Sequence, residues 1–285
     1  LDKDARRWTR VHWNLTRHID EHLQNLLGPM LRMPAHPLRL ARFGPVAVAP
    51  ASFLTKTIFS TEAARALFLG SAAHAIVPLT QPFTGAFGAL FGALGMSRGW
   101  PVVRGGTGQL VQALVSVLTS HGGRVHLNQE IDHIADLPSA DAVILNLTPA
   151  QILRVTGQRN TAPTMLSDST RRRFRNWRYG TAAYKIDFLL DAPIPWLNPA
   201  VAAAGTVHVV GTSRELVQAS TQVAAGQMPR YPFVMVGQQQ AADPLRATGE
   251  AAKKTVVWTY AHVPHGYQET YPGEVPWLIK NQIER

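Results

Sequence analysis

The sequence contains no cysteine in its 285 residues. This absence excludes a disulfide framework, a thiolate-metal site and a cysteine nucleophile, and it permits a reducing compartment such as the cytoplasm. No stretch is dominated by one residue type and no internal repeat is present, which argues against disorder and repeat architectures. With 46% hydrophobic residues, the chain can build one large domain or two ordinary ones.

The signatures of common hydrolases and phosphotransferases are also missing. There is no Gly-x-Ser-x-Gly elbow, no His-Glu-x-x-His pair and no Walker loop. His18 and His22 lie one helical turn apart, but the sequence offers no third ligand near them, so no metal site is predicted. Hydrolysis and phosphoryl transfer are therefore disfavoured.

Acidic residues are few, and the formal net charge is +10. The one dense basic cluster runs from Arg171 to Arg178 and alternates with Phe174, Trp177 and Tyr179. Aromatic rings and guanidinium groups together can bind a nucleic-acid strand. A solvated helix face that leads into a strand explains the pattern more simply, so nucleic acid is not the expected partner.

No charged residue occurs between Ala66 and Ser97. His74 and Pro78 interrupt this stretch, which therefore predicts buried helices rather than a membrane span. Phe83, Phe87 and Phe91 recur every four residues, and Gly88-x-x-x-Gly92 permits close packing of a neighbour. Two interpretations stay open. The stretch is plain core, or it has a function, either as a wall of an apolar substrate cavity or as a surface that dips into a bilayer to fetch a hydrophobic substrate.

Apolar periodicity predicts the remaining elements. A helix begins near Trp8 and ends at Gly28-Pro29, and a second follows the glycines at 105–108. Strands are predicted at Arg124–Leu127, Ala142–Leu147, Thr181–Leu190, Thr206–Val210, Pro232–Gln238 and Thr255–His262, with further helices at Ser213–Ala225 and Pro276–Arg285. The uncapped last helix, and the absence of a signal-like segment after Leu1, predict an excerpt of a longer protein.

Gly106-x-Gly108 follows the short apolar segment Pro101–Val103 and precedes a helix, as in a dinucleotide fingerprint. Glu130 even stands where a ribose-binding acid is expected. The third glycine position is occupied by Val111, however, so the motif alone is a weak sign of nicotinamide binding. A tight turn before a helix explains these glycines equally well.

Together with its surroundings, this region resembles the phytoene-desaturase-like branch of the FAD-dependent amine oxidoreductase superfamily. The matching motifs are Gly99–Pro101, Arg104–Gly108, His121–Val125 and Ala142–Pro149, followed by Tyr179–Gly180, Lys185–Asp187, Pro193–Trp196, Gly205–His208 and Trp258–Pro264. Their order covers the chain from about Trp8 to Arg285. The family's glycine fingerprint for the FAD pyrophosphate and its flavin-closing segment have no counterpart here.

The resemblance implies a mixed α/β fold: a partial Rossmann-like FAD-binding domain and a substrate domain with a mixed sheet and helices. The implied domains are a helical part of the substrate domain at 1–98, the remnant of the FAD-binding domain at 99–160 and a β-rich substrate domain at 161–285. Residues expected to face FAD are Gly105, Gly106, Val125, Thr148 and Pro149. Because the glycine fingerprint is missing, this chain alone is not expected to retain FAD.

The implied activity is oxidation of a hydrophobic small molecule by hydride transfer to flavin. The flavin carries the chemistry, while the protein supplies orientation and an apolar wall. No catalytic residue is assigned, and Phe87, Trp100 and Tyr260 are the candidates for the substrate pocket. The expected location is cytoplasmic, with peripheral membrane contact. The alternative is a non-catalytic module that binds an apolar ligand or a membrane through Ala66–Ser97.

Overall fold

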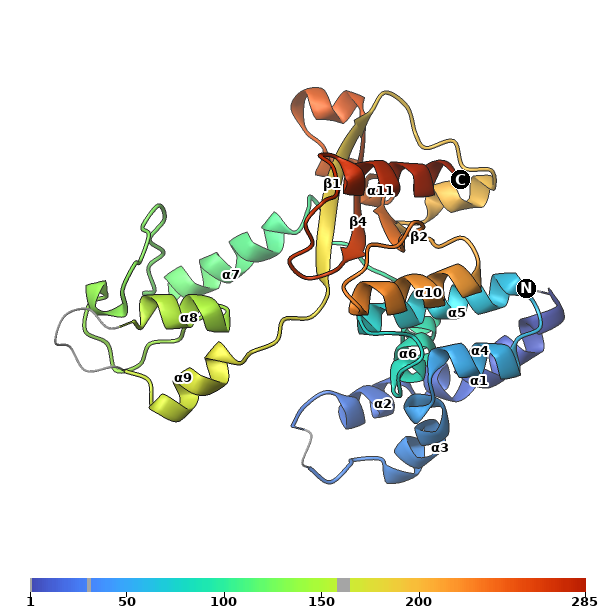
Figure 1. Ribbon diagram of the computed structural model, residues 1–285, viewed down its shortest axis with the longest axis horizontal. Helices are drawn as coiled ribbons and strands as arrows, with labels where there is room; N and C mark the ends of the chain where they lie inside the picture. The colour runs from blue at the N-terminus through green and yellow to red at the C-terminus, as the bar shows by residue number, and fades with distance from the viewer. Residues whose placement is uncertain (1, 30–31, 158–164) are drawn as a thin grey trace. The chain divides into compact units, whose positions relative to one another are not determined.

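The computed structural model describes residues 2–29, 32–157 and 165–285. Contacts divide the chain into two compact units (Figure 1). The first unit comprises residues up to Val111 together with Gly180–Arg285, and the second is Gln112–Tyr179. Among the described residues, no helix has the length and apolar character needed to cross a membrane.

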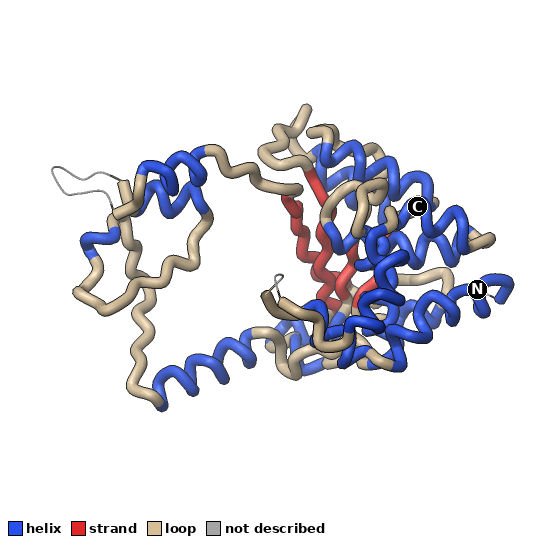
Figure 2. The backbone as a smooth tube through the Cα atoms, turned by 90° about the horizontal axis from the view of Figure 1, so that it is seen from below, coloured by secondary structure: helices blue, strands red, loops and turns tan. Residues whose placement is uncertain are grey.

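A four-stranded antiparallel sheet with the order β1-β4-β3-β2 forms part of the first unit. Its strands are β1 (Ala182–Leu190), β2 (Thr206–Val209), β3 (Val234–Gly237) and β4 (Thr255–Val263). Figure 2 shows the strands side by side among the helices. The four strands predicted between Thr181 and His262 are thus confirmed, within one or two residues at each end.

The two faces of this sheet pack against different helices. One face carries Val234, Val236 and Val257 and packs against Val275 and Ile279 of α11 (Glu274–Glu284). The other face carries Met235 and packs against a second group of helices in the first unit, which we call the helical layer. Alternation along each strand produces this division, because successive side chains of a strand point to opposite faces.

The helical layer of the first unit consists of α1 (Ala5–Arg17), α2 (Ile19–Leu26), α3 (Pro37–Val48), α4 (Ala51–Ile58), α5 (Glu62–Ala72), α6 (Thr84–Ser97) and α10 (Ser213–Ala224). The predicted N-terminal helix is therefore real but divided at His18. Short 3-10 helices complete the unit: η1 (Asp2–Asp4), η2 (Ala73–Ala75), η4 (Pro199–Ala203), η5 (Gln239–Ala241), η6 (Pro244–Arg246) and η7 (Gly249–Lys253).

Helix α6 lies at the centre of this layer and contacts α1, α3, α4 and α5. Its glycines allow the close packing: a Cβ on Gly88 would lie 2.5 Å from the Phe68 ring, and one on Gly92 would lie 2.6 Å from His12. Phe83 and Phe87 instead remain exposed, at 62% and 39%. Of the two interpretations left open for this stretch, plain core does not describe Phe83 and Phe87, because the small residues occupy the buried face of α6.

The second unit contains most of α7 (Gly108–Ser120), the 3-10 helix η3 (Ile134–Asp136), α8 (Pro149–Val155) and α9 (Asp168–Arg175). Helix α7 has no buried residue, although Leu114 and Val117 are apolar. Helix α9 also has no buried residue, as expected for a solvated basic face.

The predicted strands at Arg124–Leu127 and Ala142–Leu147 are wrong, because the structure has both segments as irregular chain and Figure 2 draws them as loop. A strand requires a hydrogen-bonded neighbour, and the described part of the second unit provides none. Leu127 and Ile144 are accordingly 77% and 93% exposed. Mixed helix and sheet is confirmed, whereas a Rossmann-like sheet is not formed by the described residues.

Candidate functional site

Six rings lie in contact along the face of the sheet that meets the helical layer. Trp258, Tyr260 and His262 alternate along β4, with ring centroids 6.1 and 5.7 Å apart. Phe233 lies 5.1 Å from His262, and His208 of β2 lies 5.4 Å from Phe233. The ring of His74 in η2 follows, 5.1 Å from His208.

The helical layer extends this row of rings from His74. The ring of Phe91 stacks on His74 at 4.9 Å, on Phe87 at 6.0 Å and on Trp100 at 5.3 Å. All these residues belong to the first unit. We call the whole set the aromatic array, and its members are Phe87, Phe91, Trp100, His74, His208, Phe233, His262, Tyr260 and Trp258.

Three glycines make room for rings of the array. A Cβ on Gly70 would lie 2.8 Å from Nδ1 of His208, and one on Gly95 would lie 2.7 Å from Nε1 of Trp100. A Cβ on Gly237, which is paired with Trp258 across β3 and β4, would lie 2.2 Å from the indole. The rings therefore lie directly on backbone, which holds them in one orientation.

The histidines of the array are neutral near pH 7. Burial lowers the pKa of His208 to about 4, with smaller contributions from His74 and His262. Burial likewise lowers the pKa of His262 to about 4 and the pKa of His74 below its ordinary value. Burial raises the pKa of Tyr260, so its hydroxyl stays protonated.

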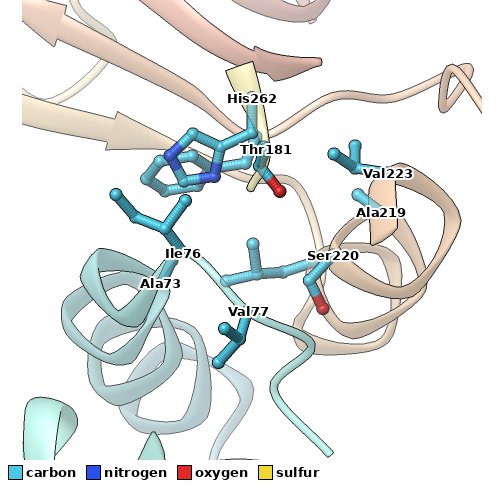
Figure 3. Close-up of a pocket in the computed structure, with 10 residues that line it drawn as sticks. Ala73, Ile76, Val77, Thr181, Ala219, Ser220, Val223 and His262 are labelled. Atoms are coloured by element: carbon cyan, nitrogen blue, oxygen red, sulfur yellow. The ribbon is translucent and has the colours of Figure 1, made fainter. Parts of the chain in front are cut away.

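A small pocket adjoins the array beneath β4 (Figure 3). His262 lines it from the sheet, Ile76 and Val77 from the segment after η2, and Ala219 and Val223 from α10. Its cavity volume of about 20 Å³ admits one water molecule rather than a substrate. Ile76 has φ +56°, a left-handed conformation that is rare for a β-branched residue.

The structure brings all three predicted pocket residues into the aromatic array. Phe87 and Trp100 both stack on Phe91, while Tyr260 lies on the sheet side. Sequence reasoning missed the histidines that join these two sides. The alternation Trp258-x-Tyr260-x-His262 was a signal for part of the sheet side, whereas nothing in the sequence pairs His74 with His208.

The predicted FAD-facing residues fall in both units. Gly105 and Gly106 form a turn in the first unit with φ +72° and +97°. The Gly105 N–H donates to Oδ2 of the buried Asp243 at 2.6 Å. A turn whose N–H is already bound to a carboxylate does not fit a phosphate, because the negative charges repel.

The other three predicted FAD-facing residues lie in the second unit. Val125 is 47% exposed in irregular chain. Thr148 is the N-cap of α8, where it forms a capping box with Gln151, and Pro149 is the first helical residue. These local roles account for Thr148 and Pro149 in the present structure.

Residues 18–162 match the profile of the family described as flavin containing amine oxidoreductase. The match covers 145 of the 285 residues, just over half, so the chain belongs to this family. The family is flavin-containing and consists of oxidoreductases, in agreement with the resemblance seen in the sequence. No curated protein and no solved structure matched the chain.

Proposed function

We propose that this chain is part of an FAD-dependent oxidoreductase, similar to phytoene dehydrogenases and amine oxidases, that oxidises a hydrophobic small molecule. The observation that carries the proposal is the aromatic array: nine rings in continuous contact, with histidines that burial keeps neutral. When bound, the flavin supplies the hydride acceptor.

The aromatic array suits an apolar substrate for two reasons. Trp100 is 60% exposed and Phe87 39% exposed, so this end of the array offers ring surface to a ligand. Tyr260 and the three histidines carry no charge near pH 7, so a substrate placed against them meets no ion that would have to lose its hydration. In this proposal the rings orient the substrate and exclude water from it.

In this proposal the flavin is held largely by protein outside these residues. Two observations support it: the Gly105 turn is occupied by Asp243, and the apolar helix α7 has no buried residue. The side chains of Leu114, Val117 and Ile144 are 62%, 58% and 93% exposed. Exposed apolar surface of this extent is typical of a face that another polypeptide covers.

The test is anaerobic reduction of the flavin in the FAD-loaded longer protein of which we propose this chain to be part. Polyenes, fatty-acyl lipids and hydrophobic amines are added in turn, and loss of the flavin's visible absorbance is followed. Trp100→Ala should raise KM for the productive class at least tenfold, whereas the control Trp13→Ala, an equally exposed tryptophan outside the array, should leave it unchanged. Failure of all three classes to reduce the flavin would refute the proposal.

We further propose a cytoplasmic enzyme that touches a membrane through α6 and its N-cap residue Phe83, because Phe83 and Met96 are exposed. Flotation with liposomes tests this contact, and Phe83→Ser should reduce the bound fraction. Equal flotation of both proteins would contradict it.

A further inference from the structure

A second pocket lies among α1, α2, α3 and α4, away from the aromatic array. Its volume of about 440 Å³ is within the range of small-molecule sites. The lining is divided between cationic or polar groups and apolar side chains. The lining residues are Arg7, Arg10, Val11, Asn14, Leu15, His22, Arg42, Phe43, Val46, Thr57 and Ile58, and we call this site the arginine pocket.

The arginine pocket carries unneutralised positive charge. Of its three arginines, only Arg7 has an acidic partner, Asp4 at 2.7 Å. Among the described residues, the exposed side chains of Arg10 and Arg42 form neither an ion pair nor a hydrogen bond, and no lining residue is acidic. Guanidinium groups that line one cavity without a counter-ion favour the binding of an anion. Each guanidinium can donate two parallel N–H hydrogen bonds to a carboxylate or phosphate group.

Asp4 does not neutralise the remaining arginines. Its fully buried carboxylate accepts hydrogen bonds from the backbone N–H groups of Ser60 and Thr61 at 3.0 and 2.7 Å, and from the Thr61 hydroxyl. Burial alone would raise the Asp4 pKa, but these hydrogen bonds and the one from Arg7 hold it well below its usual range. The Asp4 carboxylate is therefore already bound to Arg7, Ser60 and Thr61, and it does not pair with Arg10 or Arg42.

His22 places an unpartnered imidazole in the wall of the arginine pocket. Its side chain is fully buried, lines the arginine pocket, and has no hydrogen-bond partner on Nδ1 or Nε2 within the described structure. Glu21, its neighbour in the sequence, is bound to Arg39 and His18. A buried imidazole always has a donor or acceptor to satisfy. Neither nitrogen is exposed to the open cavity, so His22 bonds to a ligand there only after its ring turns.

The apolar part of the lining indicates the rest of the ligand. The partly exposed side chains of Val11, Val46 and Ile58 offer surface that an inorganic ion would leave unused, and the Phe43 ring meets His22 edge-on at 5.7 Å. Burial of apolar surface adds favourable free energy in proportion to the area removed from water. The combination fits a molecule with one anionic end and one alkyl chain.

We infer that the arginine pocket binds a single-chain anionic amphiphile. Arg10 and Arg42 hold its carboxylate or phosphate group, the His22 ring turns to donate a hydrogen bond to that group, and the alkyl chain lies on Val11, Val46 and Ile58. This inference is independent of the proposed oxidation, since none of these residues belongs to the aromatic array.

Calorimetric titration tests the inference with decanoate and decyl phosphate as probes, each below its micelle concentration. Both should bind at about one molecule per chain, while decanol and inorganic phosphate should bind at least tenfold more weakly. Arg10→Gln and Arg42→Gln should each weaken decanoate binding about tenfold, as the loss of a charge-assisted bond predicts. The matched control is Arg6→Gln, which removes an exposed charge of α1 outside the pocket.

Val46→Phe provides a second test, because it fills the pocket without altering its charge. It should abolish decanoate binding while the circular dichroism spectrum and Tm stay close to those of the parent protein. Equal affinity for decanoate and decanol, equal weakening by Arg6→Gln, or no binding of either anionic probe would overturn the inference.

Discussion

The Nε2 atom of His74 lies 3.2 Å from the Nε2 atom of His208, across 134 residues of sequence. One nitrogen donates the proton and the other accepts it, so the two rings cannot both be fully protonated while this bond exists. Because β2 carries His208 and η2 carries His74, the bond also links the sheet to the helical layer.

Stability should fall as the pH drops from about 6.5 to 4. The pKa values of His208 and His262 are lowered from 6.5 to about 4 in the folded protein. The unfolded state therefore binds more protons in this window, and protonation favours it. Each histidine accounts for a loss on the order of 3 kcal/mol if its shift is fully expressed.

Urea denaturation at several pH values measures this dependence. His208→Gln should flatten the curve between pH 6.5 and 4, while leaving the steeper loss below pH 4 that the carboxylates cause. An unchanged slope in the variant would contradict the assignment.

Gly70→Ala should destabilise the protein by about 1–3 kcal/mol, as overpacking does. The new Cβ would lie 2.8 Å from Nδ1 of His208 and displace the ring from His74. Gly108→Ala is the matched control, because nothing lies within 4 Å of its Cβ position. Thermal unfolding compares the two, and equal Tm values would show that the ring does not depend on this glycine.

Ile76→Asn should raise the free energy of unfolding by about 1 kcal/mol. Ile76 adopts φ +56°, a conformation that Asn tolerates and a β-branched side chain does not. The neighbouring Val77 is not among the residues of positive φ, so Val77→Asn should bring no gain. Chemical denaturation of both variants decides whether strain is stored at Ile76.

The purified chain should carry no stoichiometric flavin. The Gly105 N–H is already bound to Asp243, and Thr148 is used as a helix cap. The measurement is the visible spectrum, together with flavin extracted after denaturation. A yellow protein with one flavin per chain would contradict this prediction.

Local patterns predicted most elements of the first unit. Alternation of β-branched and aromatic residues was enough for β1 to β4, and apolar steps of three and four were enough for α1 and α10, because these periodicities follow from backbone geometry alone. The same reasoning failed at Arg124–Leu127 and Ala142–Leu147. A strand depends on a partner, and a single segment's composition does not contain that information.

For the candidate site, too, the sequence predicted one part and the tertiary structure revealed the other. The sequence by itself determined the family, through the order of its motifs, and it pointed to Phe87, Trp100 and Tyr260 as apolar rings. Only the tertiary structure decided that His74 and His208 join these rings into one array, and that Asp243 occupies the Gly105 turn. Such contacts join residues more than 130 positions apart, and they arise from how elements pack rather than from any local pattern.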